Sequence, residues 1–167
     1  MAPTSTFIHL GPGLTPREAA TDALYRFTQA LDDNDSSLLR SSVTLDASVD
    51  RSGLSPVTGQ AFPPAKGIEI IERFVLGTVG PVDTGHHVSN VRVKLNEHKN
   101  EAEVTCYVVA EHFKAGEGQS PEKSTSLRVG TRYRADVVED REDGLWKIKA
   151  VDLVTLWSVG DLSVFGF

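Results

Sequence analysis

The sequence predicts an α+β fold in which three N-terminal helices pack on one face of a curved antiparallel sheet. Apolar residues recur at helical spacing in the first half of the chain. After Pro81 the apolar period changes to two, which is typical of strands. Helices that precede a run of strands commonly lie together on one face of the sheet that follows.

The first predicted helix begins after Thr15, which can cap it, with Pro16 suited to the first helical position and Glu18 to closing a capping box. Its apolar stripe consists of Ala20, Ala23, Leu24, Phe27, Ala30 and Leu31. The helix is expected to end in the polar turn at residues 32–35. That turn can also cap a second, shorter helix through residues 38–39.

A first strand is predicted over residues 43–50, followed by a glycine- and proline-rich loop over residues 51–66. Apolar residues from Ile68 to Val75 indicate a third helix, which Gly77 and the Gly80-Pro81 pair would stop. Four long strands follow, at residues 84–96, 101–114, 126–139 and 145–157. Turn residues connect them, so we expect an antiparallel meander.

The length of 167 residues is typical of one domain, which we expect over residues 14–160. Residues 1–13 lack periodicity and are interpreted as an arm. The apolar tail at residues 161–167 is expected to serve as a lid or a subunit contact.

Composition excludes several classes of partner and site. The net charge of −6 argues against nucleic acid or an anionic membrane as a partner. No apolar run approaches the roughly 20 residues that span a bilayer, and no secretory signal is evident. The single cysteine, Cys106, excludes an internal disulfide and a cysteine-based zinc site. Composition predicts a cytoplasmic protein and leaves open whether it uses a cofactor. The lack of an H-x-x-x-H or similar helical spacing argues against a metal site.

Strand alternation predicts which side chains face the concave side of the sheet. In the second long strand this face is small and apolar and ends in a histidine: Ala102, Val104, Cys106, Val108, Ala110 and His112. In the third strand Tyr133 points inward, and in the last strand Leu153 and Trp157 are expected to form the pocket wall after a bulge. Small inner residues leave an apolar cavity, the usual form of a small-molecule site.

Several segments carry a family resemblance: residues 30–35 (ALDDND), 85–90 (GHHVSN), 110–113 (AEHF), 144–148 (GLWKI) and 156–158 (LWS). In order and spacing they resemble the SnoaL-like and scytalone-dehydratase-like group of the nuclear-transport-factor-two-like superfamily, over roughly residues 14–160. The resemblance implies a cone-shaped sheet. It also implies cofactor-free acid–base chemistry on a cyclic, largely apolar ketone of polyketide or terpenoid type.

The resemblance also implies site residues. Asp32 matches the aspartate that pairs with the family's second histidine, and His112 matches that histidine. The first histidine falls on His86 by its flanking residues and on His87 by its spacing from His112, so both remain candidates. Tyr133 is a candidate donor to an enolate oxygen. The expected substrate-binding residues are Phe27, Leu31, Cys106, Val108, Ala110, Leu153 and Trp157.

Two departures from the dehydratase pattern bear on the reaction. Leu31 and the Asp50-Arg51 pair stand where dehydratases of the group carry tyrosines. The expected activity is therefore that of an isomerase or cyclase in secondary metabolite biosynthesis. A dehydratase and a non-catalytic ligand-binding or docking module are the alternatives. A ring-opening hydrolase would need aspartates flanking an arginine, for which Asp50-Arg51 is the only indication. Family analogy predicts a homodimer, with a trimer as the alternative.

Overall fold

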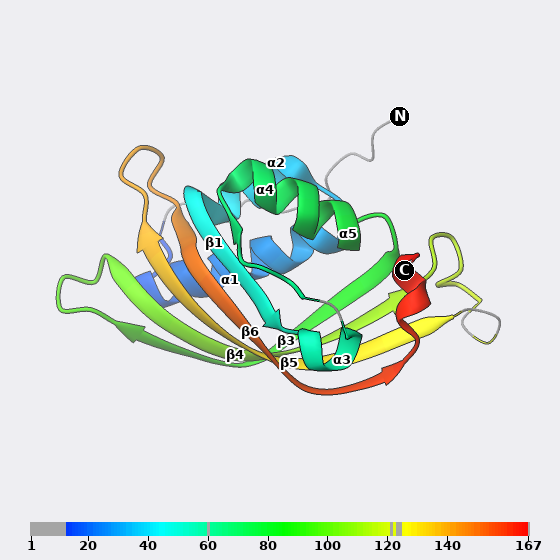
Figure 1. Ribbon diagram of the computed structural model, residues 1–167. Helices are drawn as coiled ribbons and strands as arrows, with labels where there is room; N and C mark the ends of the chain where they lie inside the picture. Colours follow the sequence, from blue (N-terminus) through cyan, green and yellow to red (C-terminus); the bar gives the residue numbers. More distant parts are fainter. Residues whose placement is uncertain (1–12, 60, 121, 123–124, 167) are drawn as a thin grey trace.

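The computed structural model describes residues 13–59, 61–120, 122 and 125–166, and it confirms the predicted α+β architecture (Figure 1). Six strands form one curved, unclosed sheet in the order β2-β1-β6-β5-β4-β3, and the main helices cover its concave face. Nearly all of the predicted arm, residues 1–12, and Phe167 of the predicted tail lie outside the described residues. No helix within the described ranges is long and apolar enough to cross a bilayer.

The first two helices form where their capping signals predict. Helix α1 (Pro16–Asp32) starts with a capping box, in which the Thr15 backbone N–H donates to Glu18 Oε2 at 2.7 Å. Its predicted apolar stripe is buried against the sheet. Helix α2 (Ser36–Ser42) is capped by the carboxylate of Asp35, which accepts from two backbone N–H groups of the first turn.

The third helix consists of α4 (Ile68–Ile71), the π-helical segment η1 (Glu72–Leu76) and α5 (Gly77–Val79), which follow one another without a gap. The prediction of a plain loop over residues 51–66 was wrong. Strand β1 (Val43–Gly53) continues into that segment, which also forms the one-turn helix α3 (Ser55–Thr58) and the short strand β2 (Ala65–Lys66). Strand β2 forms because its two residues pair with the middle of β1.

The predicted meander is present as β3 (Asp83–Leu95), β4 (Glu101–Phe113), β5 (Ser126–Glu139) and β6 (Trp146–Gly160). These strands pair antiparallel in chain order, whereas β1 pairs parallel with β6. The register between β5 and β6 shifts at two places. At each shift the alternation of β6 side chains between the two faces of the sheet is interrupted. It leaves four apolar side chains exposed, those of Val154, Leu156, Trp157 and Val159. Homodimer formation stays a prediction.

One buried arginine of α1 forms hydrogen bonds with residues that are far from it in the sequence. Arg26 of α1 is 3% exposed. Its guanidinium donates to the Trp146 carbonyl at 2.7 Å, to the Ser41 carbonyl, and to Asp22 Oδ2 at 2.7 Å. These contacts connect α1 to the end of α2 and to the first residue of β6. A buried charge of this kind is tolerated because its donors meet acceptors.

Replacing this arginine by an apolar side chain of similar length tests its structural role. We expect Arg26→Met to lower the free energy of unfolding by about 3 kcal/mol, because two buried carbonyls and Asp22 lose their donor. Arg40→Gln is the control, since Arg40 makes an exposed ion pair with Glu72 and its loss should cost less than about 1 kcal/mol. Urea unfolding of both variants measures the difference, and equal effects would contradict the assignment.

Candidate active site

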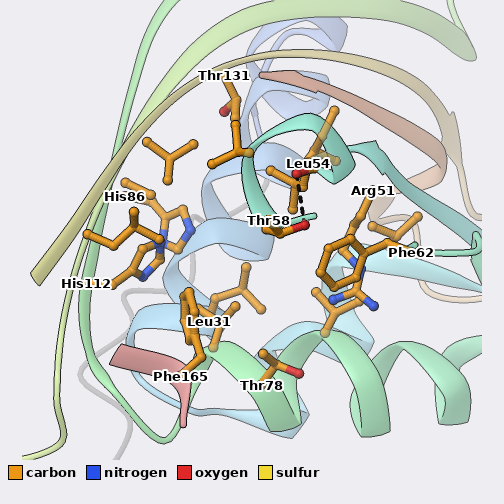
Figure 2. Close-up of a pocket in the computed structure, with 18 of the residues that line it drawn as sticks. Leu31, Arg51, Leu54, Thr58, Phe62, Thr78, His86, His112, Thr131 and Phe165 are labelled. Atoms are coloured by element: carbon orange, nitrogen blue, oxygen red, sulfur yellow. Dashed lines mark hydrogen bonds between the residues drawn. The ribbon is translucent and has the colours of Figure 1, made fainter. Parts of the chain in front are cut away.

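A cavity opens at one end of the cone, where α1 stops covering the concave face of the sheet (Figure 2). Its volume, as the space open to the centre of a water molecule, is about 100 Å³. Most of its wall is apolar and comes from α1, the strands, the third helix and the C-terminal 3-10 helix η3 (Leu162–Phe165). The polar side chains in the wall are Arg51, Thr58, Thr78, His86, His112, Thr131 and Tyr133.

Of the expected substrate-binding residues, Phe27, Leu31, Ala110 and Leu153 line this cavity. Cys106 and Val108 do not, and that expectation was wrong. Both face inward, as alternation predicted. They precede the cavity residues in β4, however, and belong to the main core cluster, where α1 packs against the strand. The concave face is therefore filled along most of its length and open only at one end.

Trp157 also lies outside the cavity, contrary to expectation. The register shift between Gly130 and Thr131 of β5 puts Thr155 opposite Thr131 and Trp157 opposite Gly130. The indole packs on Gly130, where an added Cβ would approach the ring to 2.2 Å. Because Thr131 points into the cavity and neighbouring strand residues alternate, Gly130 and the indole above it face away from the cavity.

An aspartate–histidine pair forms at the cavity wall. Asp32, the last residue of α1, accepts a hydrogen bond from His86 Nδ1 at 2.5 Å. Its second oxygen accepts from the His86 backbone N–H at 3.0 Å, so both carboxylate oxygens bind the same residue. A carboxylate only accepts, so Nδ1 carries the proton, and the neutral ring keeps its lone pair on Nε2.

The pairing differs from the one that the resemblance implied, since Asp32 binds His86 and not His112. The structure also separates the two candidates for the first histidine. The His86 side chain is 4% exposed and lines the cavity, whereas His87 is exposed. The reason is strand alternation, which points neighbouring residues of β3 to opposite faces.

His112 lies beside this pair in the same cavity. Its ring centroid is 5.8 Å from that of His86 and 4.9 Å from that of Phe165. Its Nδ1 is 2.8 Å from the hydroxyl of Thr84, the residue opposite it in β3. Burial, together with the neighbouring His86, lowers the pKa of His112 to about 4, against the opposing effect of Asp32. The imidazole is therefore neutral at physiological pH.

Burial also determines the protonation of two further groups. It raises the pKa of Tyr133, so the phenol in the cavity wall stays protonated and can donate a hydrogen bond. It raises the pKa of the Cys106 thiol to about 11, which keeps this core thiol unreactive. Among the described residues no three His, Cys, Asp or Glu side chains converge as metal ligands.

Asp50 and Arg51 do not form an ion pair. Asp50 accepts from the Ser52 backbone N–H at 2.8 Å, whereas Arg51 lines the cavity. No described aspartate forms an ion pair with Arg51. The arrangement expected of a ring-opening hydrolase, with aspartates flanking an arginine, is therefore not formed by these residues.

Sequence reasoning missed the wall that closes the cavity opposite the histidines. Leu54, Val57 and Phe62 of the segment predicted as loop contribute to it. Leu162 and Phe165 of η3 also line the cavity. Apolar residues spaced between prolines and glycines were the available signal in residues 51–66. The tail, for which a lid or a subunit contact was expected, lies at the cavity, with Phe165 against His112.

The chain is similar to known proteins in both sequence and structure. A family model for the SnoaL-like domain matches residues 13–152. Terrestric acid biosynthesis cluster protein E of Penicillium crustosum is 36% identical over 166 residues, which covers 99% of both chains.

Solved structures share the fold at lower identity. A scytalone dehydratase-like protein of Novosphingobium aromaticivorans has a TM-score of 0.68 and 22% identity, covering 86% of this chain and 85% of that one. A hexachlorocyclohexane dehydrochlorinase of Novosphingobium barchaimii has a TM-score of 0.65 and 17% identity, covering 87% and 90%. A protein of the nuclear-transport-factor-two-like superfamily from Salmonella enterica has a TM-score of 0.66 and 13% identity, covering 84% and 91%. The chain therefore belongs to the SnoaL-like family, and its fold is that of the nuclear-transport-factor-two-like superfamily.

Proposed function

We propose that this protein is a cofactor-free acid–base enzyme of secondary metabolism, an isomerase or cyclase that moves a proton next to a carbonyl group of a cyclic substrate. The observation that carries the proposal is the hydrogen bond to the partly buried carboxylate of Asp32 from the buried imidazole of His86, which lines an apolar cavity. The relative from a terrestric acid biosynthesis cluster supports a place in secondary metabolism.

In the proposed reaction His86 Nε2 removes a proton from the carbon next to the carbonyl. The electron pair of that C–H bond moves to the carbonyl oxygen and gives an enolate. Asp32 keeps the imidazole in the reactive tautomer and stabilises its positive charge after proton uptake. A positioned base of this kind typically contributes about 10²–10⁴-fold to a rate.

The enolate oxygen needs a hydrogen-bond donor, and Tyr133 and His112 are candidates among the polar side chains of the wall. Return of the proton from His86 to a different carbon completes an isomerisation. Attack of the enolate carbon on a second carbonyl completes a cyclisation, and His86 then protonates the new alkoxide. A preorganised donor in a dry site contributes on the order of 3 kcal/mol to such a step.

Dehydration additionally requires an acid that protonates the leaving hydroxyl group. With a pKa of about 4, His112 does not hold a second proton at physiological pH and is not that acid. In a dehydration the proton would come from the His86 imidazolium that forms on proton removal, or from Tyr133. The open cavity argues against a docking module, because a module without a small-molecule ligand is expected to fill its cone with side chains.

Removing the charge of Asp32 tests the proposed base. We expect Asp32→Asn to lower the rate about 10²–10⁴-fold, because an amide no longer holds the ring as a carboxylate does. Liquid chromatography with mass spectrometry of producing cells would then detect the unconverted intermediate. Asp33→Asn is the matched control, since Asp33 is the adjacent carboxylate and binds Gln29 at 2.7 Å. Equal products from both variants, at equal amounts of folded protein, would refute the role of Asp32.

The two adjacent histidines of β3 provide a second matched pair. His86→Gln should abolish conversion because the cavity loses its basic nitrogen, whereas His87→Gln should leave conversion intact because His87 is exposed. The same metabolite measurement compares them. Loss of conversion in His87→Gln alone would contradict the assignment of the base.

The neutral state of His112 predicts a pH dependence of stability. Its pKa is near 6.5 in the unfolded chain and about 4 in the fold, so the unfolded state binds more protons between these values. The free energy of unfolding should fall as the pH drops from about 6.5 to 4, by on the order of 3 kcal/mol in total. Urea unfolding of wild type and His112→Gln compares this contribution directly, because the two proteins share every other side chain. Parallel pH profiles would show that His112 is not held neutral.

A further inference from the structure

Strand β1 carries one cation on the inner face of the cone. Ala47 and Val49 are buried on this face, and Arg51 continues the same alternation into the cavity wall. An arginine is unusual in such a position, because the surrounding wall is formed by apolar side chains such as Leu54, Val57 and Leu153.

The protein uses only part of the hydrogen-bonding capacity of Arg51. Nη1 donates to the Phe74 carbonyl at 2.8 Å, and the guanidinium carbon lies 5.3 Å from the ring centroid of Phe62. Nε is fully buried and has no hydrogen-bond partner among the described residues. No described carboxylate forms an ion pair with Arg51. A partly buried cation thus keeps one fully buried donor unused.

A cation in this environment is stabilised best by an anion that enters the cavity. Burial without a counter-charge is unfavourable, and the planar guanidinium fits two oxygens at once. Asp32 does not serve this purpose, because both of its oxygens bind His86. Figure 2 shows His86 and His112 on one side of the cavity and Arg51 with Phe62 on the other.

We propose that Arg51 binds an anionic oxygen pair of the substrate, either a carboxylate or the enolate of an acidic 1,3-dicarbonyl group. This inference rests on the proposed function and names the substrate class: a compact ring that carries an acidic group on the side away from the reacting C–H bond. Binding at Arg51 separates the substrate anion from the Asp32 carboxylate, which would repel it, and turns the opposite edge of the ring toward His86.

The size of the cavity agrees with a compact substrate. A volume of about 100 Å³ is well below the roughly 300–1,000 Å³ of pockets that bury drug-sized ligands. That is room for a small ring with its substituents, and too little for an extended multi-ring molecule.

Titration of small rings into the whole chain tests the proposal without a catalytic readout. The probes are benzoate, the enolate of cyclohexane-1,3-dione, and neutral benzamide, at pH 7.5 where His112 is uncharged. Nitrogen-15 NMR follows the Arg51 Nε–H signal directly, and calorimetry gives the affinities. We expect at least one anion to shift this signal and to bind more tightly than benzamide.

Two substitutions complete the test. Arg51→Gln should weaken binding of that anion about 10- to 100-fold and leave benzamide binding unchanged, because only the charged hydrogen bonds are lost. Arg51→Lys keeps the charge and should retain part of the affinity if the glutamine variant does not fold. Arg73→Gln is the matched control, since Arg73 also stacks on an aromatic ring, at 5.1 Å from Phe74, but is exposed.

The outcomes separate the substrate class from the reaction. An effect with benzoate alone identifies a carboxylate, and an effect with the dione alone identifies an acidic dicarbonyl. If neither anion moves the Arg51 signal, or if both bind Arg51→Gln as they bind wild type, the inference is wrong. In that case a loss of conversion in Asp32→Asn would still support the acid–base enzyme.

Discussion

The hydrogen-bonded contact between Asp32 and His86 joins the end of α1 to β3, and the site depends on it. Helix α1 fills the concave face of the sheet up to Leu31 and stops there, so the same residues that end the helix also begin the cavity. Both oxygens of Asp32 bind His86, which gives the imidazole one orientation and one tautomer. The same pair of side chains therefore connects α1 to β3 and provides the candidate base.

Burial determines which side chains around the cavity are neutral. His112 and Tyr133 are neutral because a charged ring or phenolate would be poorly solvated in the apolar wall. The imidazole of His86, which Asp32 holds, and the guanidinium of Arg51 lie on opposite sides of the same space (Figure 2). One wall of the cavity therefore carries a candidate base and the opposite wall carries a cation, and apolar side chains line the space between them.

Much of the fold was accessible from local patterns. The capping residues of α1 and α2, the change of apolar period after Pro81 and the turn residues between the long strands are interactions within a few residues of one another. Ala110, His112 and Tyr133 were also placed correctly at the cavity, because alternation along a regular strand determines their face. The same rule failed for Trp157, since a register shift against a neighbouring strand reverses the alternation and has no local signal.

Local patterns in the sequence specified the α+β class, the order of helices and strands, an aspartate at the end of the first helix and histidines in the strands that follow. Packing between distant segments decided that Asp32 binds His86, that His87 is exposed, and that Arg51 and Phe165 enter the cavity. Local periodicity reflects which face of an element is buried. Which two faces meet, and where the helix leaves the sheet uncovered, depends on packing between residues far apart in the chain.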